Sequence, residues 1–373
     1  MAIIFIGGKV MTTTIMASYS YGEDCYQEIP EVLKPYHIKR VVLIGGERAL
    51  ASSEDEVRSI LVQAGIEVTG SFVYGVDSTQ TNIDKLVANP DVQRAEAIFG
   101  FGGGKALDTA KMVAKELDKP TFTFPTICSN CSAGTAIAVV YNDDHSLLKY
   151  GYPDSPLHIF INTRVIAQAP EKYFWAGIGD GISKAPEVEH AILEAKKKGT
   201  AEFPHTARLG EAVALSSKEA FYRYGQQGLE DVRNNKVSRA VEEIALDIVV
   251  STGYASNLVN QPDFYYNSCH AHAFYNGTTA IRREGEYLHG MVVSYGVLVL
   301  HAYFDEQEEL ERVANFNKAL GLPIRLQELG LTKEDIPKIV EVALTTNEYR
   351  NTPFDPEKFA QAIRTVDYLG QQL

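Results

Sequence analysis

The sequence is poor in cysteine and in long apolar runs. Its four cysteines in 373 residues are too few for the disulfide frameworks that hold small secreted proteins together. The longest apolar runs, such as residues 291–300, are too short and too interrupted to span a bilayer, and the amino terminus lacks the basic start of a signal peptide. We therefore expect a cytoplasmic protein with no membrane partner.

Positive charge is also scarce, because 35 Lys and Arg residues stand against 48 Asp and Glu residues, a net charge of −13. Nucleic-acid binding needs a basic surface, so we expect no nucleic-acid partner. The remaining composition is ordinary for a globular protein, with 45% hydrophobic and 22% charged residues. A chain of this length exceeds the size at which one core keeps growing, which predicts two domains.

The first part of the chain alternates short β-rich runs with helical patterns, which is typical of βαβ units and a mainly parallel sheet. The predicted strands are residues 41–44, 72–74, 97–101, 121–124, 137–141 and 159–162. The predicted helices between them are residues 54–64 and 82–88, the second with Thr81 as its cap, facing Asp84.

After residue 162 the β-branched runs give way to long helical periods that continue to the carboxyl end. One apolar stripe runs along a predicted helix at Val237, Val241, Ile244, Ala245 and Ile248. We therefore predict an α/β domain with a mainly parallel sheet, residues 1–163, followed by an all-α domain, residues 164–373. Ligands usually lie in the cleft between two such domains.

A glycine-rich turn between a strand and a helix is the most informative segment, Ile98-Phe-Gly-Phe-Gly-Gly-Gly-Lys-Ala-Leu-Asp-Thr-Ala-Lys111. Backbone N–H groups at the start of such a helix bind anions, and a pyrophosphate fits this geometry. Glycines alone often make nothing more than a tight turn, and neither the G-x-G-x-x-G fingerprint nor a P-loop is present. Lys105 and Asp108 beside the glycines favour a nucleotide site over a plain turn.

The segment Gly-Gly-Gly-Lys-x-x-Asp-Thr-x-Lys at 102–111, with Pro-Thr-Ile at 125–127, resembles the glycerol dehydrogenase branch of the iron-containing alcohol dehydrogenases. That resemblance implies a dehydroquinate synthase-like architecture, NAD or NADP bound by the first domain, and a homo-oligomer. It also implies a set of cofactor contacts. They are Gly102, Gly103, Gly104, Lys105, Asp108, Thr126, Ser129, Thr135, Ile137 and Tyr141.

Three later segments contain metal-ligand side chains: Ala-Gly-Ile-Gly-Asp at 176–180, His-Ala-His-Ala-Phe-Tyr-Asn-Gly at 270–277, and Leu-His-Gly at 288–290. One carboxylate and two imidazoles leave a coordination position open for substrate. The resemblance assigns Asp180, His272 and His289 as metal ligands and catalytic residues of the second domain, with His270 as the alternative ligand. The glycerol dehydrogenase branch implies zinc and the wider family iron, and we expect zinc.

The sequence departs from the family in the loop that contacts substrate hydroxyls. Cys131 stands where glycerol dehydrogenases have an aspartate, and a thiol carries no full charge at neutral pH unless it is activated. Together with Tyr141-Asn142-Asp143, this cysteine resembles a sub-branch that reduces 2-oxo acids to 2-hydroxy acids. Cys128-x-x-Cys131 lacks the second pair that a four-thiolate metal site needs.

Two further departures concern the cofactor. Gly46 stands where the family often has an aspartate for the adenosine ribose, and Arg48 nearby can pair with the 2′-phosphate of NADP or simply be a solvated residue. Tyr275 stands where the family commonly has a histidine near the nicotinamide. Both NAD and NADP therefore remain open.

These observations predict a metal-dependent oxidoreductase that moves a hydride between NAD(P) and a small polyol or alcohol. An NADPH-dependent reductase of 2-oxo acids, a hydroxycarboxylate dehydrogenase, is the alternative. A dehydroquinate synthase-like lyase needs more basic residues around a phosphorylated substrate than Lys184, Arg282 and Arg283 supply. A nucleotide-binding protein without catalysis has no need of three metal-ligand side chains.

Overall fold

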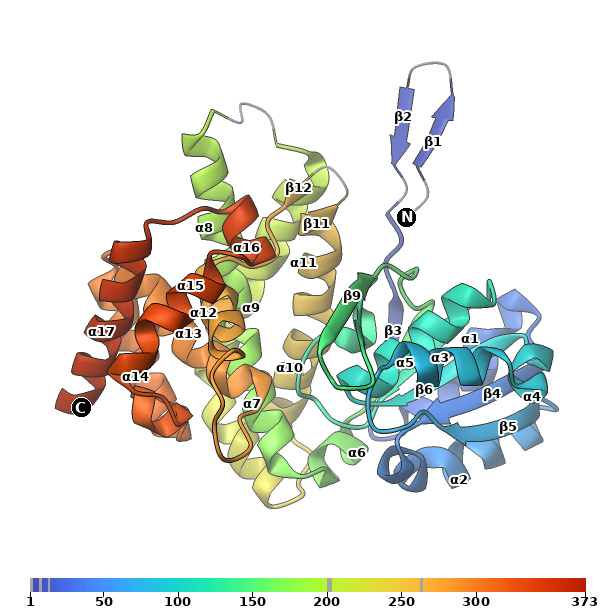
Figure 1. Ribbon diagram of the computed structural model, residues 1–373. Coiled ribbons are helices and arrows are strands. Elements are labelled where there is room, and N and C mark those ends of the chain that lie inside the picture. Colours follow the sequence, from blue (N-terminus) through green and yellow to red (C-terminus); the bar gives the residue numbers. More distant parts are fainter. Residues whose placement is uncertain (1–2, 7–8, 13, 200–202, 262–263) are drawn as a thin grey trace. The chain divides into compact units, whose positions relative to one another are not determined.

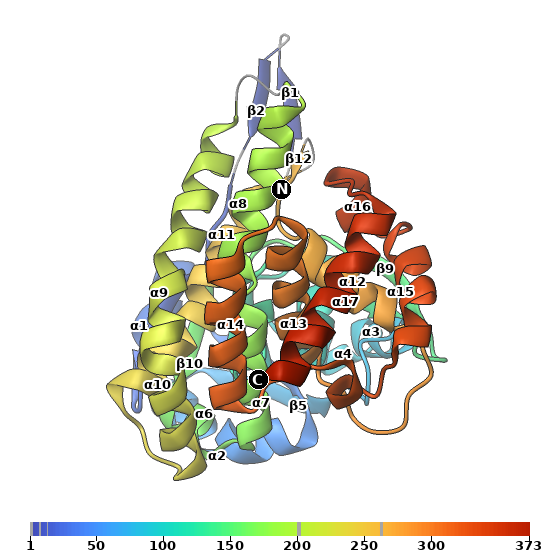
Figure 2. The same cartoon turned by 90° about the vertical axis from the view of Figure 1, so that its left-hand side faces the viewer.

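The computed structural model describes residues 3–6, 9–12, 14–199, 203–261 and 264–373. Its contacts define two compact units, Met1–Tyr173 with Asp231–Gly253, and Phe174–Glu230 with Tyr254–Leu373. The domains 1–163 and 164–373 therefore stay a prediction. The units defined by contacts differ from these domains at two places. The first unit continues to Tyr173, and residues 231–253 belong to it because they pack on its elements rather than on the helices around them in sequence. Figures 1 and 2 show the elements of both units.

The first unit is built on a six-stranded parallel sheet with the order β3-β10-β7-β6-β4-β5. The strands are β3 (Ser18–Gly22), β4 (Arg40–Gly45), β5 (Glu67–Val73), β6 (Ala97–Gly102), β7 (Thr121–Pro125) and β10 (His158–Asn162). The chain moves from β4 outward to β5 and then returns to place β6 on the other side of β4. Ligands of open parallel sheets bind at the carboxyl ends of strands where the order reverses in this way, here between β4 and β6.

Both faces of the four central strands, β4, β6, β7 and β10, are buried, which explains why these strands are mainly apolar, whereas the edge strands β3 and β5 are partly exposed. Val41, Leu43 and Phe99 belong to one buried cluster, whereas Val42 and Ile98 belong to the cluster on the opposite face. The helices and turns along this part of the chain are η1 (Cys25–Glu28), α1 (Ile29–Leu33), η2 (Lys34–Tyr36), α2 (Glu47–Gln63), α3 (Gln80–Val87), α4 (Pro90–Arg94), α5 (Gly104–Glu116), η3 (Ser132–Gly134) and α6 (Thr163–Gln168). The predicted parallel sheet with helices is confirmed.

Two local predictions need correction. The run 137–141 does form a strand, β8 (Ala138–Tyr141), but β8 pairs antiparallel with β9 (Leu147–Gly151) in a separate two-stranded sheet, because the tight turn between them folds it back on its own neighbour. Thr81 is not the cap of α3: the Thr79 hydroxyl accepts from the Asn82 N–H at 3.2 Å, whereas Thr81 donates to Asp143.

Residues 231–253 add α10 (Arg239–Leu246) and a π-helical turn, η4 (Asp247–Ser251), to the first unit. The predicted apolar stripe is confirmed at Val241, Ile244, Ala245 and Ile248, which are all buried, but Val237 lies before the helix, whose N-cap is Ser238. Asp247 is the polar residue of this turn. Its Oδ1 accepts from the Ser251 hydroxyl at 2.8 Å, and its buried Oδ2 finds no partner in the described part of the chain.

The second unit is mostly helical, as predicted. Its helices are α7 (Glu171–Gly181), α8 (Lys184–Lys197), α9 (His205–Arg233), α11 (Thr252–Val259), α12 (His270–Thr278), α13 (His289–Tyr303), α14 (Gln307–Leu320), η5 (Leu326–Leu329), η6 (Lys333–Asp335), α15 (Ile336–Ala343), α16 (Asn347–Asn351) and α17 (Pro356–Gln372), some of which cross the unit limits. The short strands β11 (Asn260–Gln261) and β12 (Phe264–Tyr265) form a small antiparallel ladder here, and β1 (Ile3–Ile6) pairs with β2 (Lys9–Thr12) near the start of the chain.

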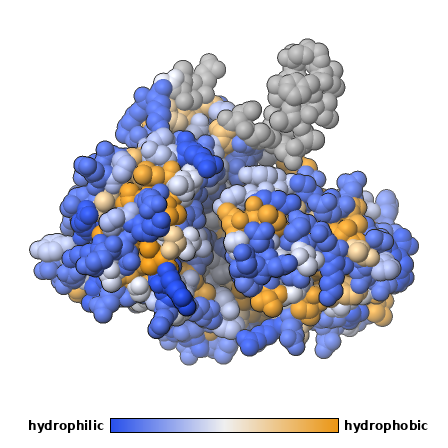
Figure 3. Space-filling view, in the orientation of Figure 1, coloured by the Kyte–Doolittle hydropathy of each residue, from blue (hydrophilic) through white to orange (hydrophobic). Residues whose placement is uncertain are grey.

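Among the residues that the structure describes, no helix combines the length and the apolar character needed to cross a membrane. The face drawn in Figure 3 is mainly hydrophilic, with smaller apolar patches between the polar residues. Scattered apolar surface of this kind is normal in globular proteins.

The unpaired oxygen of Asp247 leads to a stability prediction. Burial raises the pKa of Asp247 from 3.8 to about 6. The folded chain therefore binds the carboxyl proton of Asp247 more tightly than the unfolded chain. The ionised carboxylate lowers the free energy of unfolding above about pH 6, and this destabilisation disappears as the pH falls toward 4. Asp247→Asn should raise the free energy of unfolding by about 1–3 kcal/mol at pH 8 and by much less at pH 4. Denaturant unfolding at both pH values measures this, and an equal gain at both would contradict it.

Candidate cofactor and metal sites

The predicted strand, glycine turn and helix are present, since β6 ends at Gly102 and α5 begins at Gly104. Gly102 has φ of +135°, a conformation that favours glycine, and a Cβ there would lie 2.9 Å from the Cβ of Ala106. The first-turn N–H groups of α5 have no acceptor within the helix. The adjacent strand β4 ends at Gly45, so the two glycine segments meet at the point where the strand order reverses. This is where a dinucleotide is expected to bind.

The loop after β7 lies against the glycine turn. A Cβ on Gly103 would fall 2.4 Å from the Ile127 Cδ1 atom and 3.9 Å from the Ser129 hydroxyl. The Thr126 N–H donates to the Gly102 carbonyl at 3.2 Å. The structure thus brings together four of the predicted cofactor contacts, Gly102, Gly103, Thr126 and Ser129.

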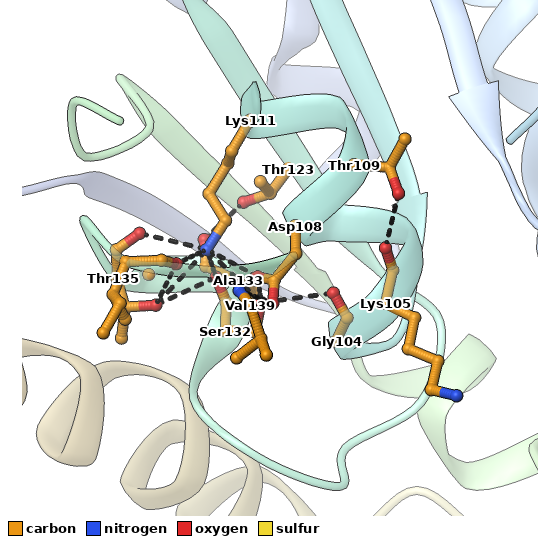
Figure 4. A network of polar contacts seen from close by, with 12 residues as sticks. Gly104, Lys105, Asp108, Thr109, Lys111, Thr123, Ser132, Ala133, Thr135 and Val139 are labelled. Atoms are coloured by element: carbon orange, nitrogen blue, oxygen red, sulfur yellow. Dashed lines mark hydrogen bonds and ion pairs between the residues drawn. The ribbon is translucent and has the colours of Figure 1, made fainter. Parts of the chain in front are cut away.

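Asp108 and Lys111 form the centre of a buried polar network, shown in Figure 4. Asp108 Oδ1 lies 3.0 Å from the Lys111 ammonium and accepts from the Ser132 hydroxyl at 2.6 Å, and its Oδ2 accepts from the Val139 N–H at 2.9 Å. Lys111 is fully buried and donates to the carbonyls of Ser132, Thr135 and Ile137. These contacts hold the loop 132–139 against α5. A direct cofactor contact by Asp108, Thr135 or Ile137 stays a prediction.

Lys105 points away from that network (Figure 4) and its side chain is 56% exposed. Its ammonium lies 3.0 Å from Asp77 Oδ2 and 5.6 Å from the ring centre of Tyr141, so two predicted cofactor residues are neighbours. Burial favours protonation of Asp77, but hydrogen bonds from His145 and Lys105 outweigh it and lower the pKa of this carboxyl. Sequence reasoning missed Asp77 because no motif links it to Lys105, which lies on a later strand–helix unit.

The three predicted metal ligands converge in the helical unit. Asp180 lies near the end of α7, His272 in the first turn of α12 and His289 at the start of α13. Asp180 Oδ1 lies 3.0 Å from His289 Nε2 and 3.8 Å from His272 Nε2, and the three ligand atoms all lie within 4.8 Å of one another. This proximity requires glycine at 290, because a Cβ there would fall 1.8 Å from the Ala176 carbonyl oxygen of α7.

A buried carboxylate from α8, Glu187, orients this cluster. Its Oε2 lies 2.6 Å from His272 Nδ1, while its Oε1 accepts from the backbone N–H groups of Cys269 and His272. Burial alone would raise the pKa of Glu187, but the adjacent His272 and these hydrogen bonds lower it. Sequence reasoning missed Glu187 because the break between α7 and α8 separates it from Asp180, so no spacing marks it.

The charges of the cluster fit a divalent cation. Burial favours the neutral form of Asp180, but the nearby His289 and His272 outweigh this effect and lower the pKa of the carboxyl. Because Glu187 occupies Nδ1 of His272, the Nε2 atom of that ring faces Asp180. One carboxylate and two imidazoles, one of them fixed by a carboxylate behind it, are the pattern of protein metal sites.

The remaining predicted residues lie as follows. His270 is not part of the cluster: it is buried against the rings of Tyr303 and Phe354, and neither ring nitrogen has a partner among the described residues. Burial lowers the pKa of His270 to about 3. The ring of Tyr275 stands edge-on to His289 with centres 4.3 Å apart. Cys131 precedes η3 and is half-buried.

The contacts of Glu187 predict a selective loss of metal affinity in Glu187→Gln. Glutamine keeps the size of the side chain but removes the charge that holds His272, so the affinity should fall by about 10- to 100-fold. Equilibrium metal titration of the stripped protein measures it. Glu189→Gln on the same helix is the matched control, and unchanged affinity in Glu187→Gln would contradict the assignment.

Comparison with known proteins identifies the family. The model of the iron-containing alcohol dehydrogenases matches residues 17–158. A glycerol dehydrogenase of Thermotoga maritima is 30% identical over 97% of this chain and 98% of its own length, and hydroxycarboxylate dehydrogenase A of Escherichia coli is 26% identical over 94% and 96%. The crystal structure of glycerol dehydrogenase from Schizosaccharomyces pombe has a TM-score of 0.83 at 27% identity, covering 97% of this chain and 92% of that one. The chain therefore belongs to the iron-containing alcohol dehydrogenase family, and it is an NAD(P)-dependent dehydrogenase of the glycerol dehydrogenase-like branch.

Proposed function

We propose that this dehydrogenase moves a hydride between NAD(P) and the hydroxyl-bearing carbon of a small polyol or alcohol, using a divalent cation held by Asp180, His272 and His289. The observation that carries the proposal is the convergence of these three ligand atoms within 4.8 Å. When bound, a cation there would polarise the substrate oxygen and lower the pKa of an alcohol hydroxyl, so that its proton would pass to water near neutral pH.

The other residues position the reactants. Glu187 fixes the ring of His272 through Nδ1, and Asp180 supplies the negative charge of the cluster. The glycine turn at 102–104 offers backbone N–H groups to the pyrophosphate, and the exposed ammonium of Lys105 adds positive charge beside it. The nicotinamide carries the hydride, so the chain needs no nucleophile of its own.

For the metal we propose zinc. Two imidazoles and one carboxylate suit both Zn²⁺ and Fe²⁺, and hydride transfer needs a Lewis acid without a redox change. The family model takes its name from iron, so the proposal of zinc rests on the ligand set and on the glycerol dehydrogenase branch. Relatives named glycerol dehydrogenase also support a polyol as the substrate.

Use of NADP alongside NAD is supported by the start of α2. Gly46 caps this helix and carries no carboxylate of its own, and the exposed Arg48 lies in the first turn, directly after the exposed carboxylate of Glu47. Assembly into a homo-oligomer and a cytoplasmic location stay predictions from the sequence.

A second candidate function is the reduction of 2-oxo acids. Cys131 supports it, because a neutral thiol in the substrate loop does not repel a carboxylate as the family's aspartate would. Hydroxycarboxylate dehydrogenase A, which is 26% identical over nearly the whole chain, is named for such a substrate class.

The ligand assignment predicts that His272→Ala and His289→Ala lose both bound metal and turnover, the latter by about a thousandfold or more, since each removes a ligand of the Lewis acid. His205→Ala, an exposed histidine at the start of α9, is the matched control and should keep both. Metal analysis and steady-state rates with zinc or iron test this. Normal turnover in either ligand variant would reject the assignment.

The substrate proposal predicts that Cys131→Asp raises kcat/KM for glycerol by about tenfold or more, because a carboxylate accepts hydrogen bonds from hydroxyls, and lowers it for 2-oxo acids. Cys131→Ser is the neutral control. Wild type and both variants are compared on glycerol, 1,2-diols, simple alcohols and 2-oxo acids, each with NAD(H) and NADP(H). Wild-type activity confined to 2-oxo acids with NADPH would replace the polyol proposal by the second candidate.

A further inference from the structure

A second cluster of two imidazoles and one carboxylate lies elsewhere in the helical unit. His190 comes from α8, His301 from the last turn of α13, and Glu306 from the turn before α14. Both imidazoles meet the same carboxylate oxygen: His190 Nε2 lies 3.1 Å and His301 Nδ1 2.7 Å from Glu306 Oε2. The three ligand atoms lie within 4.8 Å of one another, as they do in the Asp180 cluster.

The spacing of these atoms is close to that of a metal site. Ligands about 2.0–2.1 Å from a tetrahedral Zn²⁺ lie roughly 3.3 Å from one another. The distances of 3.1 and 2.7 Å therefore need changes of about 0.2 and 0.6 Å, and the distances of 3.0 and 3.8 Å in the Asp180 cluster need changes of about 0.3 and 0.5 Å.

Burial supports ligand function as well. The side chains of His190 and His301 are 7% and 4% exposed, whereas that of Glu306 is 37% exposed and contacts solvent. Phe304 stacks on the His190 ring with centres 3.9 Å apart and fixes its orientation.

We propose that His190, His301 and Glu306 form a second divalent metal site of the zinc class, with a structural role. An ion there joins α8, α13 and the turn before α14, in which Asp305 adopts a left-handed conformation with φ of +59°. Two of these helices also serve the Asp180 cluster, because α8 carries Glu187 and α13 begins at His289. The second ion therefore stabilises the helices that hold the first.

Metal stoichiometry tests this site independently of dehydrogenase activity. The full chain is stripped with a chelator and titrated with Zn²⁺ against a chromophoric competitor, and Co²⁺ absorption reports the ligand field. Wild type should bind two equivalents, and Asp180→Asn/His289→Ala should keep one. Adding Glu306→Gln, which preserves shape, should remove that one, whereas Glu308→Gln, an exposed residue in the first turn of α14, should not.

Thermal unfolding supplies the second readout. Zn²⁺ should raise the melting temperature of Asp180→Asn/His289→Ala by several degrees, because an ion that binds only the folded state stabilises it. This shift should vanish when Glu306→Gln is added. Absence of a zinc equivalent in a folded Asp180→Asn/His289→Ala protein would overturn the proposal. Retention of that equivalent after Glu306→Gln would overturn it as well. Because the background lacks the first site, failure here is distinct from failure of the proposed dehydrogenase mechanism.

Discussion

The proposed metal site depends on the hydrogen bonds of the buried Glu187 carboxylate. A charge removed from water is costly unless hydrogen bonds replace its hydration. Glu187 obtains these bonds from two backbone N–H groups at the start of α12 and from the ring of His272. One side chain thus fixes both the first turn of the helix and the orientation of the imidazole on it. The proposed metal ligand is positioned by a group that never touches the metal.

The predicted cofactor segment also contains a buried charge whose hydration is replaced by hydrogen bonds. Lys111 is buried on α5 and offers its ammonium to carbonyls of the loop 132–139 and to Asp108. Opposite charges in contact and a nearly complete set of acceptors compensate for the loss of water. The loop that contains the predicted nicotinamide contacts is therefore held to α5 by an internal ion pair, whereas Lys105 lies outside this network and pairs with Asp77.

Local signals in the sequence predicted much of this. The alternation of apolar strands with helices, the turn at 102–104 and the helical second half depend on short-range patterns, and they are confirmed. The resemblance supplied Asp180, His272 and His289, which the structure brings together. Glu187, Asp77 and the role of Lys111 escaped prediction because their partners are distant in sequence. The pairing of β8 with β9 and the packing of residues 231–253 on the first unit also depend on tertiary contacts rather than on local propensity.

Asp180, His272 and His289 are proposed to hold a divalent cation, with Glu187 behind His272. Anomalous diffraction at the metal absorption edge, from crystals grown with the cation present, tests it most directly. We expect a peak about 2.0–2.2 Å from the Asp180 carboxylate and from Nε2 of both histidines, with Nδ1 of His272 still bound to Glu187. A peak coordinated by His270, or a His272 that binds the ion through Nδ1, would contradict it.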